Sequence, residues 1–77
     1  MKLYFQNSFG EERLIAELQT EEVVMPEIYK FIDKCNAERT DIKPFKSYYT
    51  RTWLNRDGCK VFDVGSHTEF FILEWWF

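Results

Sequence analysis

Three residue types near the C-terminus could together perform hydrolytic chemistry. Asp63, Ser66 and His67 supply a carboxylate, a hydroxyl and an imidazole, which hydrolases use as orienting acid, nucleophile and base. Sequence neighbours rarely reach that geometry, and Asp, Ser and Thr beside a turn usually bond the turning backbone. We therefore expect Asp63 and His67 to flank a tight turn in which Gly65 takes a left-handed conformation, and we expect no catalytic residues.

The two cysteines and the single histidine are the candidate metal ligands. Cys35, Cys59 and His67 offer three ligands without close spacing, whereas structural zinc sites use four. A zinc site would therefore require two chains to share it. Because residues 1–7 lack the apolar stretch of a signal peptide, we expect reduced, buried thiols in a cytoplasmic protein. No metal or cofactor is expected.

Cations alternate with aromatic residues between positions 43 and 56, a mixture that single-stranded nucleic-acid-binding proteins use. In a strand, Tyr49, Arg51 and Trp53 share one face, and Lys46 could add a phosphate contact. The simpler interpretation, which we favour, is that Arg51 stacks between aromatic rings on an exposed sheet. A net charge of −3 and a pI near 5.1 also weigh against nucleic acid.

Charge is divided along the chain into an acidic and a basic block. Residues 11–29 hold six Glu and one Arg, whereas residues 30–60 hold eight basic and four acidic residues. The usual reason for such blocks is that they form solvated faces. The alternative is that the acidic block imitates a phosphate backbone, although −3 is a small charge for such an inhibitor.

The elements that must position these residues fit into one small domain, 1–77. At 77 residues a second core could not be built, and 19% aromatic content supplies a rich first core. The pattern predicts β-β-α-β-β-β, an α+β fold with one antiparallel sheet and a helix on one face. The expected strands are Lys2–Gln6, Arg13–Leu18, Ser47–Leu54, Cys59–Val64 and Glu69–Phe77. Gly10 and Gly58 are expected in left-handed turn positions.

The helix is expected to begin near Pro26, which is tolerated in a first turn, and to end near Asn36. Ile28, Phe31, Ile32 and Cys35 form one apolar stripe at helical spacing. Because no other element could cover the sheet, this stripe is expected to be core and not a cofactor pocket.

The last predicted strand, 69–77, is apolar on both faces, since seven of its nine residues are large and apolar. One helix can bury only one face of a sheet. The strand is therefore either central with loops folded over it, or its outer face is an interface for another protein or a second copy.

Three segments carry a resemblance: KSYYTRTW (46–53), DVGSHTEFF (63–71) and YFQNSFGEERLIAE (4–17). Together they resemble a group of small uncharacterised proteins encoded by phages and prophages of Gram-positive bacteria. The resemblance covers most of the chain, is loose over 21–44 and transfers no catalytic role. It implies a phage or prophage product in the bacterial cytoplasm that acts on host machinery.

Our first hypothesis is a non-enzymatic protein-interaction module. Its expected contacts are Trp53, Trp75 and Trp76 as anchors, with Arg51 and His67 as polar contacts. The partner is an unidentified host or phage protein, with a homodimer as an alternative; a membrane is not expected, because no apolar run approaches about 20 residues. The second hypothesis is a small single-stranded nucleic-acid-binding protein that uses Lys46, Tyr49, Arg51 and Trp53. An enzyme ranks third.

Overall fold

The computed structural model describes residues 1–38, 50–65 and 68–75. Along these residues the chain forms β1 (Lys2–Gln6), β2 (Glu12–Glu17), the short 3-10 helix η1 (Glu21–Val23), α1 (Val24–Glu38), β3 (Thr50–Leu54), β4 (Lys60–Val64) and β5 (Phe70–Glu74). The predicted order β-β-α-β-β-β and the α+β class are confirmed.

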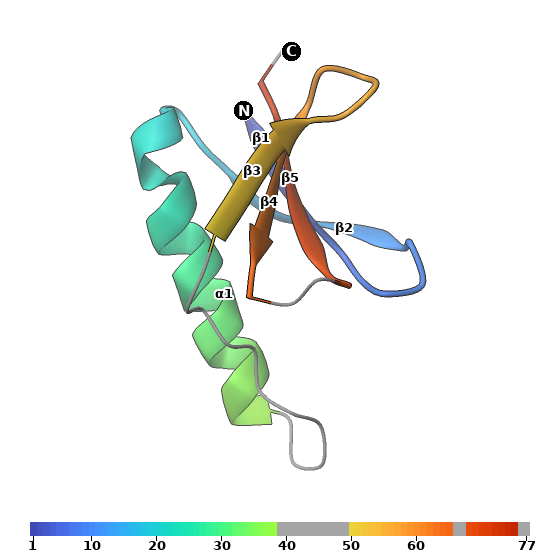
Figure 1. Ribbon diagram of the computed structural model, residues 1–77. Helices are drawn as coiled ribbons and strands as arrows, with labels where there is room; N and C mark the ends of the chain where they lie inside the picture. The colour runs from blue at the N-terminus through green and yellow to red at the C-terminus, as the bar shows by residue number, and fades with distance from the viewer. Residues whose placement is uncertain (39–49, 66–67, 76–77) are drawn as a thin grey trace.

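The strands form one antiparallel sheet in the order β2-β1-β5-β4-β3 (Figure 1). The first and last strands of the chain pair with each other, from Lys2 opposite Glu74 to Gln6 opposite Phe70. β5 therefore lies in the middle of the sheet, with one apolar face toward α1 and the other toward the opposite side. The central placement is confirmed, whereas no described element folds over the outer face, so the interpretation of that face as an interface stays a prediction.

Two hairpin turns use the same pair of residues, an Asn followed three positions later by a Gly. Asn7 Oδ1 accepts hydrogen bonds from the backbone N–H groups two and four residues later, at 2.9 and 3.0 Å. Asn55 Oδ1 does the same between β3 and β4, at 2.9 and 3.0 Å. Gly10 and Gly58 have φ values of 85° and 80°, so the predicted left-handed glycines are confirmed.

The helix begins two residues earlier than predicted, at Val24, and continues past Asn36 to Glu38. Pro26 is the third helical residue, where its missing N–H removes no helical hydrogen bond. The apolar stripe faces the sheet as expected, with Ile28 and Ile32 buried and Phe31 and Cys35 half-buried against the core.

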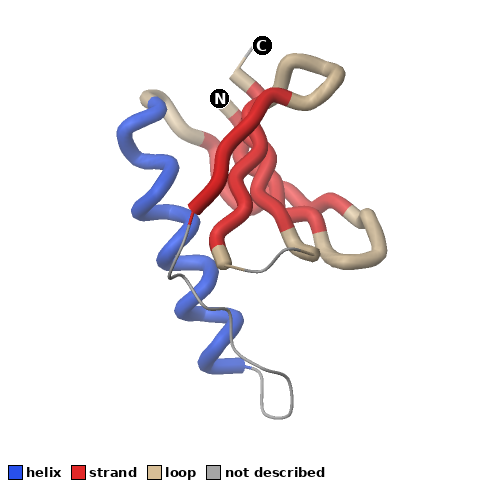
Figure 2. The backbone as a smooth tube through the Cα atoms, in the orientation of Figure 1, coloured by secondary structure: helices blue, strands red, loops and turns tan. Residues whose placement is uncertain are grey.

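The main core lies between α1 and one face of the sheet, which the helix crosses (Figure 2). The rings of Phe5, Phe31 and Phe71 form its centre, with centroids 4.8 to 5.7 Å apart. Around them lie Leu3, Leu18, Val24, Ile28, Ile32, Phe62, Val64 and Leu73. The core fixes the register of all five described strands, so it also fixes which side chains reach the opposite face.

Several strand boundaries differ from the predictions by one residue. β2 spans Glu12–Glu17 in place of the predicted Arg13–Leu18, and β4 begins at Lys60 in place of Cys59. The predicted strand residues 47–49 and 76–77 lie outside the described residues. Gly65 has φ 73°, as expected for the corner after β4.

Candidate protein-interaction face

The side of the sheet opposite α1, which we call the open face, is covered by no described element. A row of apolar side chains crosses it, because Tyr4 pairs with Ile72, Ile72 with Val61, and Val61 with Trp53. Directly opposed residues on antiparallel strands point to the same side. Leu14 on β2 lies opposite Tyr4 in turn, so all five described strands contribute to one continuous apolar row.

Trp53 forms one exposed end of this row, and Leu14, which is 45% exposed, forms the other. Val61, Ile72 and Cys59 are buried in a second, smaller apolar cluster, whereas Trp53 is 40% exposed. Its indole meets the ring of Phe70 edge-on, at 5.7 Å between centroids. The contact holds one part of the indole in place and leaves the rest available to a partner.

Arg51 lies beside Trp53 on the same face and binds Asp63 across the β3–β4 pair. Its Nη2 donates to Asp63 Oδ2 at 2.6 Å, and its Nε donates to the same oxygen at 3.3 Å. Asp63 is fully buried, while the Arg51 side chain is 58% exposed and its guanidinium carbon lies 5.7 Å from the Trp53 ring centroid. Asp63 therefore serves as the counter-ion that positions Arg51, a role that sequence reasoning missed.

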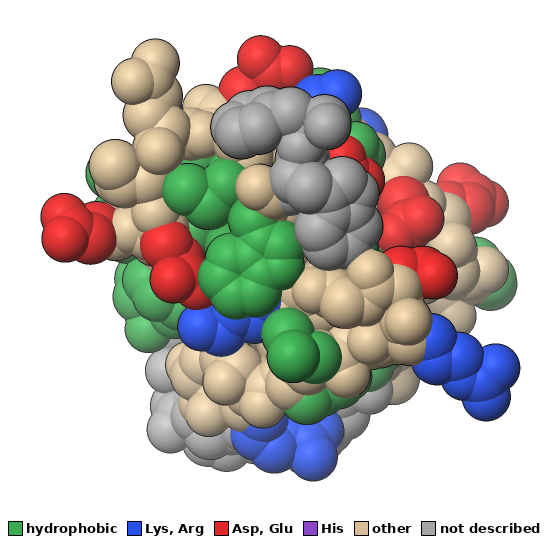
Figure 3. Space-filling view, turned by 90° about the horizontal axis from the view of Figure 1, so that it is seen from above, with side chains coloured by type: hydrophobic (Ala, Val, Ile, Leu, Met, Phe, Trp, Pro, Cys, Tyr) green, Lys and Arg blue, Asp and Glu red, His purple; other side chains and the backbone are tan. Residues whose placement is uncertain are grey.

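Trp75 lies apart from the apolar row, just after β5. Its indole Nε1 donates to the carbonyl oxygen of Gly58 at 3.0 Å and ties the end of β5 to the β3–β4 turn. The side chain is 37% exposed. Figure 3 looks onto the end of the molecule where this turn and both termini lie, and shows apolar side chains with acidic ones on either side. Trp75 thus combines a structural contact with exposed area.

The remaining predicted contact residues lie outside the described residues: Trp76, His67, Lys46 and Tyr49. Of the interaction set, the structure brings Arg51 and Trp53 together. Trp75 lies apart from these two residues, just after β5, and its indole bonds to the β3–β4 turn. The assignment of all these residues as contacts stays a prediction.

The two cysteines lie on opposite faces of the sheet. Cys35 packs against the main core, and Cys59 belongs to the cluster on the open face. Neither forms a disulfide, as expected; Cys59 is buried as predicted, whereas Cys35 is half-buried. Burial raises the pKa of Cys59, and the carboxylates of Glu74, Asp57 and Glu12 raise it further. Since the thiolate is the reactive form, these surroundings suppress nucleophilic reactivity at Cys59.

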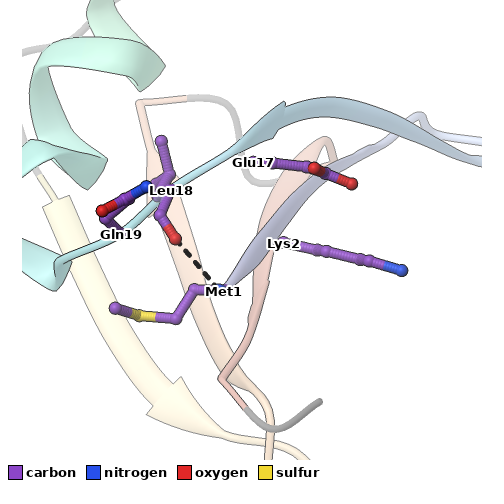
Figure 4. A pocket seen from close by; sticks show the side chains of 5 residues that line it. All are labelled: Met1, Lys2, Glu17, Leu18 and Gln19. Carbon is purple, nitrogen blue, oxygen red and sulfur yellow. Dashed lines mark hydrogen bonds between the residues drawn. The ribbon is translucent and has the colours of Figure 1, made fainter.

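A cavity of about 490 Å³ lies where β1 begins and β2 ends. The Met1 amino group donates to the carbonyl oxygen of Leu18 at 3.0 Å (Figure 4). Lys2 and Glu17 extend away from Leu18 and Gln19 in this view, so their charged ends do not converge with them on one point. The cavity therefore lacks the converging polar groups that define a catalytic site.

Across residues 1–38, 50–65 and 68–75, no three potential ligands are grouped so that they could hold a metal ion. Within the same ranges, no helix is long and apolar enough to cross a membrane. Comparison with protein families, curated proteins and solved structures finds no match. The resemblance to phage and prophage proteins therefore stays a prediction.

Proposed function

We propose that this chain is a non-enzymatic protein-interaction module whose open face binds another protein. The observation that carries the proposal is the half-exposed Trp53 at one end of an apolar row, with Arg51 held beside it. Tyr, Trp and Arg are the residues that contribute most to binding energy in protein interfaces. The resemblance stated above adds the context of a phage or prophage product that modulates a host protein.

The open face is well suited to binding because its contact groups are already held in position. Trp53 packs against Phe70, and Arg51 is anchored by two hydrogen bonds to Asp63. Ordering a free side chain at an interface costs about 0.5–1.5 kcal/mol. These contacts reduce that cost for the two largest exposed groups of the face.

The nucleic-acid alternative has weaker support from the same residues. Asp63 neutralises Arg51, whose charge would otherwise attract phosphate. Glu12, Asp57 and Glu74 add negative charge next to Cys59 on the open face. Lys46 and Tyr49, the other residues of that hypothesis, stay predictions.

Capture from a nuclease-treated lysate of a Gram-positive bacterium, quantified by mass spectrometry, tests the proposal. The variant is Trp53→Ser, and the matched control is Leu54→Ser. Leu54 is the next residue of β3, is 63% exposed, and points to the other side of the sheet. Both variants are first checked by circular dichroism and thermal unfolding.

We expect the wild type and Leu54→Ser to retain the same protein and Trp53→Ser to lose it. Equal retention by both variants would place the contact elsewhere on the chain. Capture that disappears when nuclease is added would favour the nucleic-acid alternative. Recovery of only the chain itself would indicate self-association.

A further inference from the structure

A second cavity, of about 370 Å³, opens on the same side of the sheet as Trp53 but nearer its centre. Its floor is formed by Ile72 and Cys59, both of which are buried, and the Tyr4 ring lines its side. Cys59 is 7% exposed. The cavity therefore offers an apolar floor and an aromatic wall.

Three carboxylates surround this floor and come from three separate parts of the chain. Glu12 belongs to β2, Asp57 to the β3–β4 turn and Glu74 to β5. None of the three forms an ion pair within the described residues, whereas Asp63 and Glu21 pair with Arg51 and Lys60. The cavity thus gathers negative charge that no ion pair among the described residues compensates, above an apolar floor.

The cation that lies opposite Glu74 in the sheet does not satisfy these carboxylates. Lys2 is the cross-strand neighbour of Glu74 and also of Glu17, yet it forms no ion pair with either in the described chain. Lys2 lines the cavity at Met1 and does not line this one. A cation from outside the chain would therefore meet the negative charge without displacing an existing ion pair.

The residues that line this cavity fit the side chain of an Arg or Lys better than a metal ion. The described residues form no group that could hold a metal ion. An Arg or Lys side chain instead combines an apolar stem, which can lie against Ile72 and Tyr4, with a charged end that carboxylates bind. A guanidinium group can also stack on an aromatic ring. The cavity has space for one such side chain.

We propose that this cavity receives an Arg or Lys side chain of the protein that docks on the open face. Glu12, Asp57 and Glu74 bind its charged end, and Ile72, Cys59 and Tyr4 contact its stem. The identity of the donor as a partner protein rests on the proposed function. Binding of the cationic side chain to the cavity can be tested without that partner.

The test is an NMR titration of ¹⁵N-labelled protein with N-acetylarginine methylamide. N-acetylcitrulline methylamide, which has nearly the same shape without the charge, is the ligand control, and N-acetyllysine methylamide tests the second cation. The variant Glu74→Gln removes one carboxylate from the cavity. Glu22→Gln removes the same charge from η1, outside the cavity lining.

We expect saturable shifts of the Cys59 and Ile72 amide signals with the arginine or lysine compound and none with the citrulline compound. Glu74→Gln should raise the Kd for the arginine compound about threefold to fivefold, as expected for loss of one partly exposed ion pair. Glu22→Gln should leave this Kd unchanged. Equal shifts with citrulline, no saturable shifts with either cation, or equal Kd values for the two variants would overturn the proposal.

The two proposals fail separately. Trp53 does not line the cavity, so Trp53→Ser should abolish partner capture and leave the arginine titration intact. If Trp53-dependent capture is observed and the titration fails, the cavity proposal alone is overturned. If the titration succeeds and capture does not depend on Trp53, the proposed function fails and the cavity remains a cation site.

Discussion

The Arg51–Asp63 pair gives the most quantitative prediction, because one partner is fully buried and the other half-exposed. Arg51→Met keeps the length and apolar volume of the side chain but removes two hydrogen bonds donated to Asp63 Oδ2, at 2.6 and 3.3 Å. A hydrogen bond to a charged group contributes about 1.5–3 kcal/mol. The longer bond is weak, and the Arg51 side chain is 58% exposed, which lowers the total.

We therefore expect Arg51→Met to reduce the free energy of unfolding by about 2 kcal/mol. For a domain of this size, that corresponds to a fall in Tm of about 8–16 °C. Urea unfolding followed by circular dichroism measures the first quantity and a thermal melt the second. Arg56→Met is the matched control, because Arg56 lies exposed in the β3–β4 turn.

A double-mutant cycle with Asp63→Asn separates the pair from the effect of each single change. The coupling free energy between Arg51→Met and Asp63→Asn should be about 1 kcal/mol or more, because the two side chains are in direct contact. A cycle without coupling, or an Arg51→Met variant that melts like Arg56→Met, would refute the role of Asp63 as the counter-ion of Arg51.

Two further predictions concern a thiol and a turn. The pKa of the Cys59 thiol is raised in the folded protein, so above about pH 9 this thiol ionises more readily in the unfolded chain than in the folded one. The free energy of unfolding should therefore fall more steeply with alkaline pH in the wild type than in Cys59→Ala. Parallel pH profiles of urea unfolding for the two proteins would contradict this. Gly10→Ala should cost about 1 kcal/mol, because φ is 85° although a Cβ would meet nothing within 4 Å. Gly10→Asn should cost less, since Asn tolerates this conformation, and an Ala variant as stable as the wild type would contradict the reasoning.

Local patterns predicted most of the architecture. The bounds of β1 matched, and the glycines of both hairpin turns adopt the predicted left-handed conformation. The two-sided apolar character of β5 left a central strand and an interface strand as alternatives, and the structure places it centrally, between β1 and β4. These features depend on neighbours in sequence or on the composition of one segment.

Contacts between segments were harder to predict. The Arg51–Asp63 pair depends on the β3–β4 register, which follows from counting outward from the turn at Asn55 and Gly58 until position 51 meets position 63. That signal was present in the sequence. The carboxylates around Cys59 come from two strands and a turn whose proximity depends on the whole strand order, which no local pattern contains.

Site-specific photo-crosslinking in cells of a Gram-positive bacterium tests the role of the open face most directly. A photoreactive benzoylphenylalanine replaces Trp53 in one version of the protein and Leu54 in the other, so the two probes occupy adjacent residues on opposite sides of β3. The account predicts that position 53 gives one defined adduct with another protein and that position 54 gives none. Equal adducts from both positions, or none from position 53, would contradict it.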